Sequence, residues 1–321
     1  MEGRLTQNDV TNAVNVEQPG AVREAIRKLF EARYAGESFD LLDRVFDDVE
    51  RLFAGRMPGY LPCDTLYHDM RHTLDVTLAM ARLIDGHDRV RSPAEQLGPE
   101  RARLGVITAL LHDSGYLRHR SDTRHKHGAE YTRIHVSRSA EFLKNYLPDV
   151  GLGRHTSLAS RLVHFTGYEI ALDNIHIDDP RDRRLGHMLG SADLMAQMSD
   201  RLYLEKCRDY LYDEFVLAGL ARETLPDGSV RVHFSSAEDL LAKTPAFHQQ
   251  VIKHRLEHSF DGVQQFATAH FGGRNLYIEE MVKHLRHLAH VLRNGGMRLL
   301  RRQSVSLSQR PAAKETGEVS A

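Results

Sequence analysis

The apolar run that ends in His112-Asp113 constrains the fold of this chain more than any other segment. Its apolar residues recur at the spacing of one helical face, so the sequence predicts a buried helix over residues 100–112. The residues of that face are Leu104, Ile107, Leu110 and Leu111. Because a buried charge is costly unless it is paired or bound to a metal, an imidazole and a carboxylate at the edge of the core indicate a functional group of residues.

Helical spacing of apolar residues continues through most of the chain, and an all-α fold is therefore expected. Five helices are expected to surround one polar-centred core, over residues 66–83, 100–112, 135–146, 156–165 and 185–199. Further helices are expected over residues 39–55, 201–218, 245–258 and 276–293. The turn signal at residues 226–229 precedes an alternating pattern that predicts a short strand over residues 230–234.

The chain is expected to form one domain with loose ends. Residues 1–20 are polar and predict a flexible N-terminus, and the Ser-, Ala- and Glu-rich residues 301–321 predict a disordered tail. Residues 21–300 would form a single all-α domain. Its metal core would span about residues 60–220, and residues 221–300 would be a C-terminal helical extension.

The charge balance argues against a nucleic-acid or membrane partner. The 43 basic and 44 acidic residues give a net charge of −1, so no global field favours a polyanion or a lipid surface. Cys63 and Cys207 lie far apart in sequence and form no metal or redox motif, which fits a reducing, cytoplasmic setting. The sequence has no apolar stretch of bilayer length and no signal-peptide pattern, so a cytoplasmic protein without membrane contact is expected.

Histidine is frequent, with 20 residues, and three acidic or imidazole groups recur on one predicted helix. His68, His72 and Asp75 stand at positions i, i+4 and i+7, which project from one helical face. Two imidazoles one turn apart can share a metal, or one can bind while the other acts as an acid or base. The same spacing also fits a solvated face with incidental histidines.

Three further groups stand at the ends of apolar faces or inside them. His135 opens one predicted helix, His164 ends another, and Asp193 lies in the small and apolar stretch Leu189–Leu194. Each has an alternative reading as a capping residue or a hydrogen-bonded core residue. Together they suggest a metal cage, and imidazole with carboxylate but no thiolate suits Fe, Mn, Zn or Mg.

The order of these residues resembles the HD superfamily of metal-dependent phosphohydrolases over about residues 60–220. Tyr67–Val76 is similar to the Tyr-His-Asn-x-x-His-x-x-Asp-Val motif of cyclic nucleotide phosphodiesterases. Ser191–Leu194 resembles their second metal motif, and residues 213–215 lie at a similar offset beyond it. His135–Leu143 and Val163–Tyr168 resemble segments of the HD-GYP cyclic-dinucleotide phosphodiesterases.

The chain also departs from these families. Asp69 replaces an asparagine, Ser114–Tyr116 lacks an additional histidine, and Glu169 stands where HD-GYP proteins have proline. Residues 243–248 lack the glutamine that clamps a purine. The residues of the metal core therefore match these families better than the residues of the substrate pocket do. Specificity for cyclic AMP or GMP is not expected.

The resemblance implies an HD-domain helical bundle with additional flanking helices and two divalent metal ions, chosen among Mn, Fe, Mg and Zn. The first ion would be held by His72, His112, Asp113 and Asp193. Asp113 would bridge to the second ion, whose site His135 and His164 would complete. Asp75 would orient one of the histidines without itself binding a metal.

The implied reaction is hydrolysis of a phosphoester of a nucleotide or cyclic nucleotide by a metal-activated hydroxide. His68 would protonate the leaving oxygen, and Asp113 would act beside it through the metals. The basic loop over residues 117–127 would hold the substrate phosphate through Arg120, Arg124 and Lys126, although a solvated loop fits the same sequence.

Some alternatives stay open at this level. His125 and His127 could replace the proposed ligands of the second ion. His284, His287 and His290, which lie on one predicted helix, are expected to be surface or packing residues. An HD-type di-iron oxygenase and a non-catalytic HD module that senses a nucleotide are alternative functions. A homo-oligomer, the substrate and the native metal are not decided by the sequence.

Overall fold

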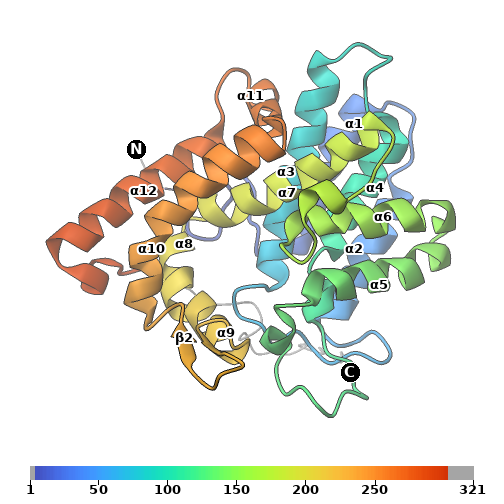
Figure 1. The fold of residues 1–321 in the computed structure, drawn as a ribbon. Helices are drawn as coiled ribbons and strands as arrows, with labels where there is room; N and C mark the ends of the chain where they lie inside the picture. The colour runs from blue at the N-terminus through green and yellow to red at the C-terminus, as the bar shows by residue number, and fades with distance from the viewer. Residues whose placement is uncertain (1–3, 303–321) are drawn as a thin grey trace, which may run out of the picture.

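The structure is a computed structural model that describes residues 4–302 of the 321-residue chain, and within that range it is helical except for one short hairpin and connecting turns. Figure 1 shows α3 and α7 crossing the middle of the molecule, with the other helices around them. The predicted all-α fold is therefore confirmed.

The helices have the following bounds: α1 Pro19–Arg33, α2 Asp40–Phe53, α3 Met70–Val90, α4 Gly98–Leu111, α5 His135–Asp149, α6 Thr156–Leu162, α7 Pro180–Ser199, α8 Tyr203–Lys206, α9 Tyr212–Leu217, α10 Ala237–Gln250, α11 Phe266–His270 and α12 Leu276–Asn294. Two π-helical segments continue α8 and α10, namely η6 Cys207–Leu211 and η7 Val251–Ser259.

Helix α3 is the centre of the fold. Every residue from Met70 to Asp88 is buried, because α7, α4, α1 and α11 pack around it. The approach of α11 is close: a Cβ at Gly86 would lie 1.9 Å from the Phe266 carbonyl oxygen, so only glycine fits there. A helix that is buried on all sides presents polar residues to several different parts of the core.

The N-terminal segment packs against α3. Val16 is buried, Asp9 pairs with Arg82 of α3, and Glu17 lies 3.0 Å from Arg71. The polar composition of residues 1–20 predicts a flexible segment. The described part of this segment, residues 4–20, is instead held by these ion pairs. Residues 303–321, most of the predicted disordered tail, lie outside the described range.

Capping residues account for the differences between predicted and observed helix bounds. Helix α3 begins at Met70 rather than residue 66 because the Asp69 side chain accepts a hydrogen bond from the His72 backbone N–H. Helix α7 begins at Pro180, capped by Asp179, and α10 begins at Ala237, capped by Ser236.

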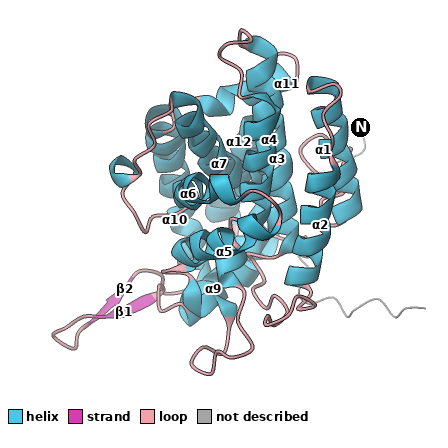
Figure 2. Cartoon of the chain, turned by 90° about the vertical axis from the view of Figure 1, so that its right-hand side faces the viewer, coloured by secondary structure: helices cyan, strands magenta, loops and turns pink. Residues whose placement is uncertain are grey.

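The C-terminal elements extend the helical core. Helix α12 packs against α7, and the strands β1 (Arg222–Thr224) and β2 (Val230–Val232) form an antiparallel hairpin. Figure 2 shows this hairpin projecting away from the helices. The second strand matches the predicted one. None of the helices between residues 4 and 302 combines the length and apolar character that crossing a bilayer requires.

Candidate metal centre

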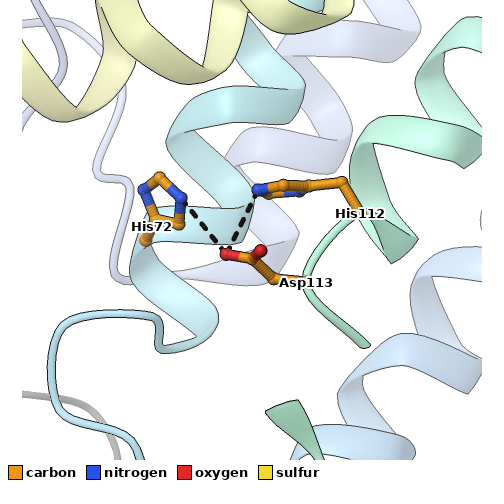
Figure 3. Close-up of side chains that lie close together, drawn as sticks. All are labelled: His72, His112 and Asp113. Atoms are coloured by element: carbon orange, nitrogen blue, oxygen red, sulfur yellow. Dashed lines mark ion pairs between the residues drawn. The ribbon is translucent and has the colours of Figure 1, made fainter. Parts of the chain in front are cut away.

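His72, His112 and Asp113 meet in the core from two helices (Figure 3). His72 lies in the first turn of α3, and His112-Asp113 directly follows α4. The Asp113 Oδ2 atom lies 3.4 Å from His72 Nε2 and 3.2 Å from His112 Nε2. Each residue offers a ligand atom within 4.8 Å of the others, so the group could hold a metal ion.

Asp193 joins this group from α7. Its Oδ1 atom lies 3.2 Å from His72 Nε2 and 3.9 Å from His112 Nε2. The small residues before it allow α7 to approach closely, since a Cβ at Gly190 would lie 2.5 Å from the Phe165 carbonyl oxygen. The four residues predicted to hold the first ion are therefore gathered in one place.

The donor atoms of this group suit a divalent cation. His112 Nδ1 lies 2.7 Å from the Ala109 carbonyl oxygen, which can only accept, so Nδ1 carries the proton and Nε2 keeps its lone pair. His112 Nε2 and Asp113 Oδ2 are enclosed and have no hydrogen-bond partner among the described residues, because their 3.2 Å contact lacks hydrogen-bond geometry. Enclosed atoms of this kind are rare unless a ligand or ion uses them.

The electrostatics of His72, His112 and Asp113 show the same need for positive charge. Burial disfavours a charged His72, but the adjacent carboxylates of Asp113 and Asp193 outweigh it and raise the pKa of His72 to about 10. Burial likewise acts against a charged His112, yet Asp113 raises the pKa of this imidazole as well. Burial would raise the pKa of Asp113, but His112 and His72 hold it well below its usual range. The two carboxylates thus attract any cation that reaches them.

His135 stands beside the cluster on the first turn of α5. Its Nδ1 lies 2.7 Å from the Thr132 carbonyl oxygen, and its Nε2 lies 3.8 Å from Asp113 Oδ1. The anchoring is the same as for His112 and again leaves Nε2 as a lone-pair donor. The close approach depends on Gly115, where a Cβ would lie 1.8 Å from the His135 carbonyl oxygen.

Tyr116 contacts both His135 and His68. Its ring stacks on both imidazoles, with centroid distances of 4.4 Å to each, and the two imidazole centroids lie 6.3 Å apart. The tyrosine was not predicted as a site residue, and only its position three residues after His112-Asp113 could have suggested it. The three rings therefore form one packed group beside the cluster.

His68 is held by a buried glutamate. The Glu214 Oε2 atom lies 2.6 Å from His68 Nδ1, and Oε1 accepts hydrogen bonds from the backbone N–H groups of Leu66 and Tyr67, both at 2.7 Å. The His68 ring lies 5.8 Å from the His72 ring between centroids. The sequence located Glu214 only by its offset from Asp193 and gave it no role.

His164 was predicted as a ligand of the second ion. Its Nδ1 is enclosed without a hydrogen-bond partner among the described residues, and burial lowers its pKa while Glu169 opposes the change. No ion pair of the described chain joins His164 to Asp113. Glu169 lies between the two histidines: its carboxylate is 3.9 Å from His135 Nδ1 and caps α5 through Val136 N. The residues described here thus assemble a site for one ion, and a second ion stays a prediction.

Asp75 differs from its predicted role behind a site histidine. It is buried on α3, and its Oδ1 has no partner among the described residues. Burial and the nearby Asp200 raise the pKa of Asp75 to about 6, while Arg4 and Arg71 act in the opposite direction. Its electrostatic neighbours are Asp200 at the end of α7, Arg4 and Asp9 of the N-terminal segment, and Arg71 of α3.

The basic loop makes local contacts. The Arg120 guanidinium donates to the Gly55 carbonyl oxygen at 3.0 Å. Within residues 4–302, no ion pair or side-chain hydrogen bond joins Arg120, Arg124 or Lys126 to the metal-binding cluster, so their binding of substrate phosphate stays a prediction. The alternative metal ligands are used otherwise: His125 pairs with Asp122 at 2.9 Å, and the His127 ring caps η2 (Gly128–Tyr131).

The three histidines of α12 behave as packing or surface residues, as predicted. His284 is buried, and its Nδ1 lies 2.9 Å from the Met198 carbonyl oxygen. His290 is exposed.

Comparisons of this chain with protein families, with curated proteins and with solved structures find no match.

Proposed function

We propose that this protein is a metal-dependent phosphohydrolase of the HD type, acting on a phosphoester of a nucleotide or another small molecule. The observation that carries the proposal is the enclosed group of His72, His112 and Asp113, with Asp193 at its side and donor atoms that lack partners. Imidazole and carboxylate donors suit Mn, Fe, Zn or Mg. A bound cation of this kind acidifies water and offsets the charge that develops on phosphoryl oxygens.

His68 and Glu214 supply the proton transfer in this proposal. A carboxylate accepts, so the 2.6 Å contact places the Nδ1 proton of His68 toward Glu214 and turns Nε2 toward the substrate side. His68 can then deliver a proton from Nε2 to the leaving oxygen, as a general acid.

Tyr116 and His135 complete the wall of the site. Tyr116 packs against the rings of both His68 and His135, which limits the rotation of the general acid. His135 lies near the outer oxygen of Asp113 and is the residue that would first contact a second cation or a phosphoryl oxygen. The chain's own groups therefore bind, orient and protonate the substrate around one position.

The test is metal analysis of the purified protein followed by turnover assays with Mn, Mg, Fe and Zn. The substrates are p-nitrophenyl phosphate, bis(p-nitrophenyl) phosphate and a set of linear and cyclic nucleotides, each with and without oxygen. We expect one tightly bound ion, oxygen-independent hydrolysis of a phosphoester to an alcohol and either inorganic phosphate or a phosphomonoester, and loss of both the ion and the hydrolysis in Asp113→Asn. The control His233→Ala changes an exposed histidine of the hairpin and should keep both.

Other outcomes contradict the proposal in different ways. Turnover that requires oxygen and iron would identify an oxygenase instead. Nucleotide binding without hydrolysis and without metal would identify a sensing module, because such a module has no need of the enclosed ligand group.

A further inference from the structure

Arg255 is a buried cation without a carboxylate partner. It lies in η7 and is 8% exposed. Its described hydrogen bonds both use Nη2, which donates to the carbonyl oxygens of Phe165 at 3.2 Å and Gly167 at 2.5 Å. Its Nε is enclosed without a partner. No ion pair of residues 4–302 includes Arg255, although a buried guanidinium is costly when it is not paired.

Aromatic rings compensate part of this cost. The guanidinium carbon lies 3.9 Å from the centre of the Tyr168 ring and 5.3 Å from the centre of the Phe260 ring. Such contacts stabilise a desolvated cation but bring no negative charge. Tyr168 is itself 69% exposed, which is unusual for a large aromatic residue that packs only within its own fold.

A cavity of about 240 Å³ adjoins Arg255. Its apolar wall consists of residues from the 167–172 segment and from η7, namely Ile170, Ala171, Leu172 and Val251. The polar part of the lining beside the arginine consists of Tyr168, Gln250, His254 and Ser259, with Gly167 at its edge. A hollow with apolar walls and one buried cation has the composition of a small-ligand site rather than of a packing defect.

We propose that this cavity binds a small organic carboxylate whose body is apolar or aromatic. The carboxylate would pair with Arg255, and the body would lie against the apolar wall and the Tyr168 ring. With Nη2 committed to two carbonyls and Nε enclosed, Nη1 remains to donate to a ligand. A phosphate group has three acceptor oxygens, and its sites gather several cations or backbone N–H groups, whereas this lining holds one arginine, the exposed His254 and no lysine.

The site is separate from the metal centre and is tested by binding alone. Isothermal titration calorimetry uses phenylacetate and octanoate as probes, with phenylacetamide and octanamide as neutral counterparts of the same shape. We expect at least one carboxylate to bind, and its amide to bind at least about tenfold more weakly because the charged hydrogen bond is lost.

Two variants locate the binding. Arg255→Met removes the charge, and Ala171→Phe fills the cavity from an exposed position while leaving Arg255 in place. Both should lose binding of the carboxylate, and Arg293→Met, an exposed arginine of α12, should retain it. Circular dichroism checks that each variant is folded. If Arg255→Met does not fold, Ala171→Phe decides.

Several results overturn the proposal. They are the absence of binding for both carboxylates, equal binding of acid and amide, and unchanged binding in Ala171→Phe. Tighter binding of phenyl phosphate than of phenylacetate would show that the site is built for a phosphoryl group instead.

Discussion

Two buried polar clusters lie on helix α3, and they differ in charge. The first is the metal centre, in which His72 faces the carboxylates of Asp113 and Asp193. The second begins one residue earlier, at Arg71, which lies 2.8 Å from Asp200 and 3.0 Å from Glu17. Asp200 also pairs with Lys206 at 2.8 Å.

The second cluster contains its own cations, whereas the first has no permanent positive charge. Because a buried carboxylate requires a counter-charge, the Arg71–Asp200–Lys206 cluster is complete as it stands and has a structural role. The candidate metal centre is complete only with protonated histidines or with a cation. Burial and ion pairing are common to both clusters, and the lack of a permanent positive charge distinguishes the first from the second.

The largest effect should come from Asp193→Ala, which removes one of the two carboxylates of the metal centre. We expect loss of the bound metal, loss of turnover and a lower melting temperature together. At a metal concentration of ~100 times the dissociation constant, binding stabilises the native state by ~2.7 kcal/mol, which the variant would lose. Elemental analysis and calorimetry on the same samples measure all three.

Asp173→Ala, an exposed carboxylate, serves as the control for this variant. Normal metal content in Asp193→Ala together with reduced stability would make Asp193 a structural residue. The difference in charge between the two clusters of α3 would then no longer account for metal binding at the first cluster.

The next effect concerns His68→Ala, which should keep the metal and reduce kcat by ~10²–10⁴-fold, the usual contribution of a general acid. Glu214→Gln should cause a smaller loss, because the imidazole remains but its charged partner is gone. Metal content and the pH profile of kcat are the measurements. A loss of metal in His68→Ala would show that His68 is a ligand, and the proposed role would be wrong.

Asp200→Asn tests the self-contained cluster. The substitution leaves Lys206 without a partner and Arg71 with Glu17 alone, so we expect the free energy of unfolding to fall by ~3–5 kcal/mol. Metal content per folded molecule should be unchanged. Urea unfolding measures the stability, and elemental analysis measures the metal content. A loss of metal at full stability would show that the two clusters form one site.

The smallest effect is a pH dependence at Asp75. Burial and Asp200 raise the pKa of Asp75 to about 6, above the model-peptide value of ~3.9 for an unfolded chain. The protonated form therefore contributes stability that is fully present below ~pH 4 and is lost as the pH rises through about 6. Asp75→Asn should remove this part of the profile and be the more stable protein at high pH.

Urea unfolding of the wild type and Asp75→Asn between pH 4 and pH 8 measures this difference, which should be a few kcal/mol at most. Asp173→Asn provides the exposed control. Parallel profiles for the wild type and Asp75→Asn would place Asp75 in a solvated or fully paired position, contrary to its burial.

Two parts of the candidate site were predictable from the residues that precede them. The apolar face of residues 104–111 located His112-Asp113 at the edge of the core, and the small residues before Asp193 indicated a close approach of α7. The contacts of Glu214 with residues 66–68 were not predictable, because they join segments about 146 positions apart. No local pattern encodes such a pairing.

The sequence by itself determined that the chain is helical and where most helices lie, and it placed His112-Asp113 and Asp193 in the core. Periodicity and capping are local patterns, so they can be recognised in the sequence without knowledge of the fold. Only the tertiary structure decided that His72 and Asp75 enter different clusters. A helix buried over Met70–Asp88 has no solvent face. On such a helix, the neighbouring elements alone decide whether a polar side chain meets a carboxylate, an arginine or a metal.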